Sequence, residues 1–277
     1  MDNRLNRVAI AQQTLAILEQ GYYLNSQGVQ VSLAAQQAHA QSNSRHYRSV
    51  ELATISVQTV PEARFNARFE VRNESTLAGS RRLLDEGFDQ VACLNFASAK
   101  NPGGGFLGGA EAQEENLAKS SGLYPCLAQM LAMYEGNRRL SNCLYSDDMI
   151  YSPAVPVFRD DSYALLDEPI CVSMITSPAV NRGALARNDP HLLDSVDEVM
   201  QVRIDKLLAL AHAQGHRVLV LGAWGCGVFA NDPAQMAQWF ANALVLGRWS
   251  GVFEKICFSV LEKKDRGCLS AFEKMFG

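Results

Sequence analysis

Apolar residues recur at three- and four-residue intervals near the start of the chain. The stripe consists of Leu5, Val8, Ala11, Leu15 and Leu18. This spacing predicts an amphipathic helix, which we expect to end near Gly21. From there to about residue 63 the pattern is mixed, and it predicts a short strand over 29–33, an Ala/Gln-rich helical piece and a Ser/Asn/Arg loop. We therefore interpret residues 1–63 as an N-terminal helical extension, or cap, on the rest of the chain.

From residue 64 onward, short apolar runs alternate with segments of helical period. Strands are expected over 69–72, 91–96, 150–153, 170–176, 217–221 and 256–261. Helices are expected from Ser75 or Thr76, over 113–134, 193–211 and 232–246, and at the C-terminus. The alternation predicts an α/β fold with a largely parallel central sheet. Because no repeat or linker interrupts it, residues 64–277 are expected to form one structural unit.

Composition narrows the class of protein. The 277 residues are 48% hydrophobic, enough for a sizeable core, and 25 basic against 29 acidic residues give a net charge of −4. A mild acidic excess argues against sequence-specific binding to nucleic acid and against an anionic membrane surface. No apolar run approaches the ~20 residues of a membrane span, and the N-terminus lacks the pattern of a signal peptide. We predict a cytoplasmic protein with no membrane partner.

Cysteine and histidine spacing gives no sign of a bound metal. The seven cysteines form no CxxC pair, and the five histidines form no HExxH motif. Neither a zinc knuckle nor a redox pair is therefore indicated. The sequence predicts no metal site and no cofactor.

A glycine-rich loop follows the expected strand over 91–96. Five of seven consecutive residues are glycine, and the next helix is expected to open at Gln113. In an open α/β sheet, ligands bind beyond the carboxyl ends of the strands, where loops turn into helices. A backbone without Cβ atoms can approach a phosphate closely and point its N–H groups at it. We interpret this loop as one side of an anion site, the alternative being a flexible surface loop.

A second loop of the same kind spans 222–232, again between a strand and a helix. It matches G-x-G-x-x-A, one form of the dinucleotide fingerprint, and Glu262 could then serve as the ribose-binding acid. Only fifteen residues follow Glu262, too few for the further βαβ units of such a sheet. A nicotinamide-dependent oxidoreductase is therefore our third hypothesis. Cys226 could be a nucleophile, or simply a small side chain in a tight loop, and Trp224 is expected to pack.

Glu114 and Glu115 open the helix that follows the first loop. Acids at the first turn of a helix are stabilised by its dipole, by ~0.3–1 kcal/mol, which would explain them without any chemistry. Their position beside a predicted anion site offers a second interpretation. A carboxylate near a bound diphosphate has its pKa raised by like-charge repulsion and partial burial, which suits it to donate a proton.

Together these residues resemble a known family. Gly103-Gly104-Gly105, seven residues and then Gln113-Glu114-Glu115 are similar to the GGG-x(6–8)-QEE signature of poly(ADP-ribose) glycohydrolases. Segments 94–102, 151–161, 177–181 and 222–233 resemble the bacterial-type branch of that family. The resemblance covers about residue 64 to the C-terminus and, more loosely, the N-terminal helix. It implies a macrodomain fold, in which a mixed sheet between helices binds ADP-ribose.

The resemblance also implies roles for individual residues. Glu115 would be the acid that protonates the departing ribose hydroxyl and afterwards the base that activates water, while Glu114 would orient the terminal ribose hydroxyls. Gln113 would support them. Glu74 would contact adenine. The remaining ligand-binding residues implied in this way are Asn101, Gly103, Gly104 and Gly105 in the first loop, and Gly225, Cys226, Gly227, Val228 and Phe229 around the diphosphate, with Phe229 against the terminal ribose.

The chemistry agrees with a single acid/base residue. Neighbouring residues on a helix point about 100° apart, so Glu114 and Glu115 cannot face each other across a sugar as the two carboxylates of ordinary glycosidases do. Our leading hypothesis is hydrolysis of the ribose–ribose O-glycosidic bonds of poly(ADP-ribose), with release of ADP-ribose. The alternatives are a non-catalytic ADP-ribose reader, which has no need of the two acids, and a mono-ADP-ribosyl hydrolase. The physiological substrate stays open among polymer, modified protein, modified nucleic acid and free metabolite.

Overall fold

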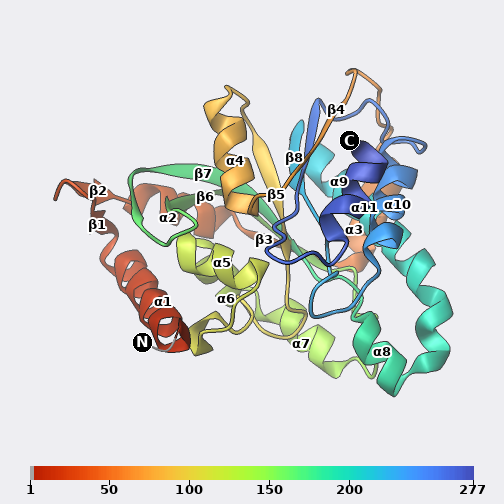
Figure 1. Cartoon of the computed structure of the whole chain (residues 1–277), viewed down its shortest axis with the longest axis horizontal. Coiled ribbons are helices and arrows are strands. Elements are labelled where there is room, and N and C mark those ends of the chain that lie inside the picture. Colours follow the sequence, from red (N-terminus) through yellow and green to blue (C-terminus); the bar gives the residue numbers. More distant parts are fainter. Residues whose placement is uncertain (1–2) are drawn as a thin grey trace.

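A mixed seven-stranded sheet forms the middle layer of the protein (Figure 1). In the computed structural model, which describes residues 3–277, the strand order is β3-β6-β7-β5-β8-β9-β4. The ladders that join β7, β5, β8, β9 and β4 are parallel, and those that join β3, β6 and β7 are antiparallel. The predicted α/β fold with a mixed, largely parallel sheet is confirmed. The strands are β3 (Arg45–Tyr47), β4 (Arg68–Arg72), β5 (Val91–Phe96), β6 (Met149–Arg159), β7 (Leu165–Ser177), β8 (Val218–Leu221) and β9 (Lys255–Ser259).

Helices cover both faces of this sheet (Figure 1). A small hairpin, β1 (Tyr22–Leu24) and β2 (Gln30–Ser32), stands apart from it. Among the described residues, none of the helices combines the length and apolar character that crossing a membrane requires. The helices are α1 (Asn3–Gln20), α2 (Ala34–Asn43), α3 (Ser49–Gln58), α4 (Thr76–Asp85), α5 (Gln113–Ser120), α6 (Leu123–Ala128), α7 (Leu131–Arg139), α8 (Arg182–Asn188), α9 (Val196–Ala213), α10 (Pro233–Leu244) and α11 (Cys268–Phe276), with 3-10 turns η1 (Phe106–Gly108) and η2 (Pro190–Ser195).

Two hydrophobic cores lie on opposite faces of the sheet, because successive strand residues point to opposite sides. In β5, Ala92 and Leu94 pack with α3, α9, α10 and α11 on one face. Val91 and Cys93 of the same strand pack with α4, α5, α6 and α7 on the other. Both faces of the central strands are thus buried, which explains their nearly continuous apolar sequence.

Side-chain caps fix two of the predicted helix starts. The Ser75 hydroxyl accepts the N–H of Ala78 at 3.0 Å and begins α4, and the Asp232 carboxylate accepts the N–H of Gln235 at 2.8 Å and begins α10. Such caps satisfy N–H groups that have no partner within the helix. Both helices follow strands of the sheet, so the caps also set where the preceding loops end.

The single helix predicted over 113–134 is wrong, because the chain forms α5, α6 and α7 there. Ser121 adopts an extended conformation (φ −147°) and bridges to Val157 of β6. The N–H of Gly122 donates to the Pro156 carbonyl at 2.9 Å, and the side chain of Gln37 donates to the Gly122 carbonyl at 3.0 Å. These long-range bonds replace the helical ones. The result is a short, separate helix that carries the two acids.

The loop predicted after the Ala/Gln-rich helix is also wrong. Residues 45–47 form β3, the outermost strand beside β6, and 49–58 form α3, which packs on α9. The sequence of α3 is rich in β-branched residues, and Val50 and Val57 are exposed, so no apolar stripe is visible in it. Part of the N-terminal extension thus belongs to the central sheet.

Candidate active site

The two glycine loops lie side by side at one edge of the sheet. The first follows β5 and the second follows β8, and these strands are parallel neighbours. The indole N–H of the buried Trp224 donates to the Ser177 carbonyl at 3.1 Å and so ties the second loop to the end of β7. The carboxyl ends of three adjacent strands therefore meet here, the usual place for a ligand in such a sheet.

The Glu114 side chain is buried within the first loop, and only 3% of its surface is exposed. Its Oε2 accepts the N–H of Ser98 at 2.6 Å, and its Oε1 accepts the Asn95 amide at 3.3 Å. Burial, together with the nearby Glu115 carboxylate, raises the pKa of Glu114 to about 8, although these hydrogen bonds act in the opposite direction. Near neutral pH, Glu114 is therefore mostly protonated and can donate a hydrogen bond.

The raised pKa of Glu114 predicts a specific dependence of stability on pH. Between its ordinary pKa of 4.5 and about 8, the folded protein keeps a proton that the unfolded chain releases, so stability falls as pH rises. Glu114→Gln removes this loss. As the pH rises from about 5 to about 9, we expect the stability of the variant relative to the native protein to increase by on the order of 3 kcal/mol.

Denaturant unfolding of both proteins across that pH range measures this gain. Glu198→Gln is the matched control, since the exposed Glu198 lies in the first turn of α9. A stability difference between Glu114→Gln and the native protein that does not change with pH would contradict the assignment.

The Glu115 side chain is bound to the backbone of the first loop. Its Oε1 accepts the N–H of Gly105 at 2.9 Å. A Cβ placed on Gly104 would overlap Glu115 Oε1 and would lie 3.1 Å from Glu114 Oε2. Both carboxyl groups therefore converge on the bare backbone of one glycine, which has a left-handed φ of +60°.

Gln113 braces the start of α5 against β5. Its Oε1 accepts the N–H of Phe96 at 2.8 Å, and its Nε2 donates to the Leu94 carbonyl at 2.7 Å and to the Thr76 hydroxyl at 3.0 Å. All of its hydrogen-bonding groups are thus used inside the protein. This geometry fits the supporting role predicted for Gln113.

Helix α1 holds the far end of the first loop. Arg4 Nε donates to the Gly108 carbonyl at 2.9 Å, and Arg7 Nε donates to the Gly109 carbonyl at 2.7 Å. A Cβ on Gly109 would lie 2.7 Å from the Arg4 carbonyl oxygen, so only glycine permits this approach. No local pattern predicts these contacts, because they join residues more than a hundred positions apart.

A buried lysine fixes the other end of the acid-bearing helix. Lys119, four residues after Glu115, is fully buried, and its Nζ lies 2.5 Å from Glu111 Oε2 and 4.6 Å from the centre of the Tyr163 ring. The Tyr163 hydroxyl donates to Glu111 Oε1 at 2.7 Å. Tyr163 has a left-handed φ of +66°, a strained conformation for a tyrosine. The hairpin between β6 and β7 thus packs against α5.

The second loop presents unpaired N–H groups. The main-chain amides of Gly227, Val228 and Phe229 donate to no acceptor within residues 3–277. Gly225 has a φ of +72°, and a Cβ there would lie 2.6 Å from Ala179. Successive unpaired amides of this kind can donate hydrogen bonds to an anion.

Cys226 does not have the properties of a nucleophile. Burial raises the pKa of its thiol well above the usual range, and its Sγ lies 3.8 Å from the Trp224 carbonyl oxygen. A reactive cysteine needs a lowered pKa. Of the two interpretations left open by the sequence, the structure favours a small packed side chain.

The other two predicted ligand-binding residues, Asn101 and Glu74, follow β5 and β4. The Asn101 carbonyl accepts the N–H of Gly104 at 3.0 Å. Glu74 follows β4, which β9 separates from β8, and its carboxylate is paired with Arg82 at 2.8 Å. The adenine contact of Glu74 stays a prediction.

Glu262 does not fit the dinucleotide hypothesis. Its carboxylate accepts the N–H groups of Arg266, Cys268 and Leu269 at 2.8, 3.1 and 3.2 Å. It therefore caps α11 instead of facing a ribose.

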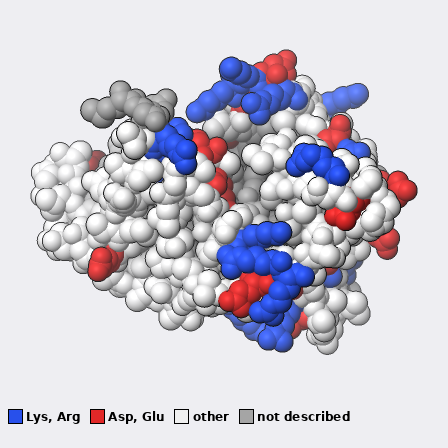
Figure 2. Space-filling model, turned by 90° about the horizontal axis from the view of Figure 1, so that it is seen from below, with Lys and Arg blue, Asp and Glu red and all other residues white. Residues whose placement is uncertain are grey.

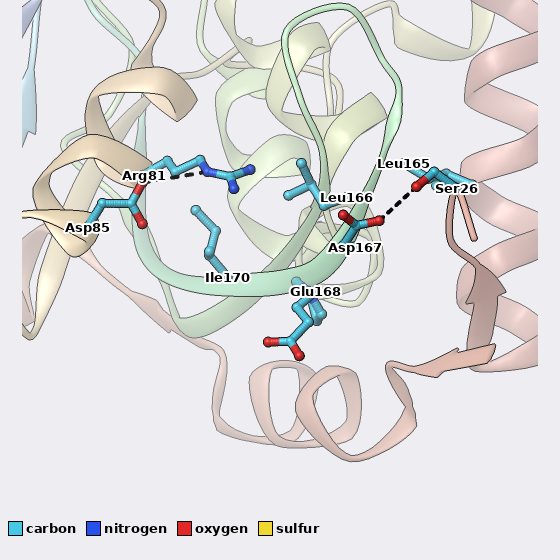
Figure 3. Close-up of a pocket in the computed structure, with 9 residues that line it drawn as sticks. Ser26, Arg81, Asp85, Leu165, Leu166, Asp167, Glu168 and Ile170 are labelled. Atoms are coloured by element: carbon cyan, nitrogen blue, oxygen red, sulfur yellow. Dashed lines mark hydrogen bonds and ion pairs between the residues drawn. The ribbon is translucent and has the colours of Figure 1, made fainter. Parts of the chain in front are cut away.

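A cavity of about 540 Å³ lies elsewhere, at the start of β7 (Figure 3). Asp85, Asp167 and Glu168 line it together with Arg81, and Asp167 accepts a hydrogen bond from Ser26 at 2.9 Å. Three carboxylates against one guanidinium disfavour a diphosphate. Within residues 3–277 no group of His, Cys, Asp or Glu could hold a metal ion.

A layered α/β sheet with two glycine loops and two convergent carboxyl groups at one edge defines a macrodomain-like hydrolase. The family model for the microbial-type PARG (poly(ADP-ribose) glycohydrolase) catalytic domain matches residues 11–160. The chain belongs to the microbial-type poly(ADP-ribose) glycohydrolase family, whose members are glycoside hydrolases.

Solved structures agree with this family. The poly(ADP-ribose) glycohydrolase from Thermomonospora curvata is 47% identical, with a TM-score of 0.95 over 99% of this chain and 100% of that one. The same enzyme bound to the inhibitor ADP-HPD gives 47% and 0.91 over 98% and 99%. The enzyme from Deinococcus radiodurans in complex with ADP-ribose is 42% identical, with a TM-score of 0.82 over 86% and 96%. A comparison with curated proteins finds no match.

Proposed function

We propose that this protein hydrolyses the ribose–ribose bonds of poly(ADP-ribose) and releases ADP-ribose, with Glu115 as the single general acid and base. One observation carries the assignment of roles: the buried Glu114 and the partly buried Glu115 converge on Gly104 but differ in environment. The inhibitor complex of the Thermomonospora enzyme and the ADP-ribose complex of the Deinococcus enzyme support a ligand of the ADP-ribose type.

In the first step, Glu115 donates its proton to the oxygen of the departing ribose as the glycosidic bond breaks. The anomeric carbon then carries the positive charge of an oxocarbenium-like species. In the second step, the Glu115 carboxylate accepts a proton from water, whose oxygen bonds to that carbon. Glu114, which is mostly protonated near neutral pH, donates a hydrogen bond to a ribose hydroxyl and so orients the sugar without adding charge.

The second loop binds the diphosphate. The unpaired amides of Gly227, Val228 and Phe229 supply hydrogen bonds to it. Val228 is 87% exposed, so it leaves this backbone accessible. A phosphate bound here lies at the same edge of the sheet as Glu114 and Glu115.

Gly227→Val tests the second loop. A Cβ on Gly227 meets no atom within 4 Å, so the free protein should keep its stability. ADP-ribose at a hundredfold excess over its Kd should stabilise the native protein by ~2.7 kcal/mol, and we expect the variant to lose most of that gain. Thermal melts with and without ADP-ribose measure both quantities. An unchanged gain in the variant would place the diphosphate elsewhere.

Product analysis tests the function itself. Purified protein is incubated with poly(ADP-ribose) and, separately, with mono-ADP-ribosylated protein, and the products are resolved. We expect free ADP-ribose from the polymer. Binding without release would favour the reader, and release from the modified protein alone would favour a mono-ADP-ribosyl hydrolase.

We also propose that residues 1–63 and 64–277 fold together and that the protein is cytoplasmic. The contacts of Arg4 and Arg7 with the first loop, and the pairing of β3 with β6, support a single folding unit. All seven cysteines are free, three of them buried, as is usual in a reducing compartment.

A further inference from the structure

Helices α7 and α8 carry an excess of positive charge on an acidic protein. Their sequences contain four arginines and one glutamate, a net charge of +3, whereas the whole chain has −4. Lys100, just before the first loop, adds another cation. We call Lys100, Arg138, Arg139, Arg182 and Arg187 the basic rim.

Most of the basic rim has no acidic partner. Arg139 pairs with Glu135 at 3.3 Å. Among residues 3–277, the side chains of Lys100, Arg138, Arg182 and Arg187 form no ion pair with any carboxylate. Unpaired cations on a protein of the opposite net charge create a local positive field that is open to an anion.

The basic rim touches both glycine loops. On one side, Arg138 Nη2 lies 3.5 Å from Asn101 Oδ1 in the first loop. On the other, the N–H of Gly183 in α8 donates to the Phe229 carbonyl of the second loop at 2.9 Å. The residues after α7 also contact those before α8, because the N–H of Asn181 donates to the Cys143 carbonyl at 3.0 Å. The rim is therefore continuous with the mouth of the site.

Figure 2 shows this side of the molecule, on which Figure 1 places α7 and α8. Lysine and arginine side chains lie around a hollow in the surface, and some acidic side chains lie between them. A chain of ADP-ribose units repeats its diphosphate in every unit. Once one unit occupies the site, the others must leave across the surrounding surface.

We propose that the basic rim binds the phosphates of the polymer beyond the unit being cleaved. The inference rests on the proposed function and extends it, since the glycine loops hold one unit and the rim holds its neighbours. The rim offsets the repulsion between an acidic protein and a polyanion. It raises the affinity for long chains without affecting that for free ADP-ribose.

A triple variant, Arg138→Gln, Arg182→Gln and Arg187→Gln, tests the rim. With long poly(ADP-ribose) at low salt, we expect KM to rise about tenfold with little change in kcat. Each phosphate contact on a single strand contributes ~0.7 to the logarithmic salt slope, so the slope of KM should fall by about 2. Turnover of a two-unit substrate and the affinity for ADP-ribose should stay unchanged.

The control removes three cations at the opposite edge of the sheet, where β4 and β8 begin: Arg64→Gln, Arg68→Gln and Arg217→Gln. This variant should behave as the native protein. An equal KM of the native protein and the rim variant for long polymer would overturn this proposal. An equal loss of activity of the rim variant on two-unit and on long substrates would overturn it too. A single-stranded RNA of equal charge that competes as strongly as polymer would show a general polyanion surface and also overturn it. Failure of the native protein on every substrate would instead reject the proposed function.

Discussion

Glu115→Gln is expected to bind ADP-ribose with nearly native affinity and to lose turnover by about 10²–10⁴-fold. The glutamine has nearly the same volume, and its amide oxygen can still accept the N–H of Gly105, which lies 2.9 Å from the native carboxylate. Only the transferable proton is lost. Because the same group serves both steps, the loss should fall on kcat.

Turnover on poly(ADP-ribose), ADP-ribose affinity and melting temperature together separate the two explanations of Glu115. If Glu115 merely stabilises the helix start, its substitution costs a few tenths to about 1 kcal/mol of stability and spares turnover. Glu198→Gln supplies that comparison, because Glu198 occupies the first turn of α9 without a glycine loop. A fully active Glu115→Gln protein would reject the catalytic assignment.

Gly104→Ala is expected to abolish most turnover, by about 10²-fold or more, and to weaken ADP-ribose binding. The new methyl group would overlap Glu115 Oε1 and lie 3.0 Å from its Cδ and 3.1 Å from Glu114 Oε2. Both acids must therefore shift. The left-handed φ of +60° adds strain of roughly 1–2 kcal/mol for any residue with a Cβ.

Gly108→Ala is the matched control for Gly104→Ala. It lies in the same loop, but a Cβ there meets no atom within 4 Å and its φ is not left-handed. Steady-state kinetics should find it nearly native. Equal losses in both variants would mean that general loop rigidity matters, and that Gly104 has no special relation to the acids.

Local patterns predicted much of this fold. The strand over 91–96 matches β5, and the caps at Ser75 and Asp232 begin helices where expected. The break at Ser121 and Gly122 was not predicted, although residues 119–122 interrupt the apolar pattern. Bonds from Gln37 and Pro156, distant in the chain, decide the break, and periodicity carries no information about them.

Part of the candidate site could likewise be predicted from the sequence, and part could not. The two glycine loops and the paired acids are readable from spacing, and the structure brings them to one edge. The hydrogen-bond partners of those acids cannot be predicted from spacing. Burial raises the pKa of Glu114 even without ligand, against the hydrogen bonds from Ser98 and Asn95, whereas the sequence analysis invoked repulsion from a bound diphosphate together with partial burial.

The tryptophan that ties the second loop to β7 also provides an optical probe. Trp224 is fully buried, and its indole N–H donates to the Ser177 carbonyl at the end of β7, two strands away from β8. Its fluorescence therefore depends on the position of the loop that supplies the unpaired amides. With Trp239 and Trp249 replaced by phenylalanine, the emission of Trp224 alone would follow movement of this loop in real time, without a chemical label.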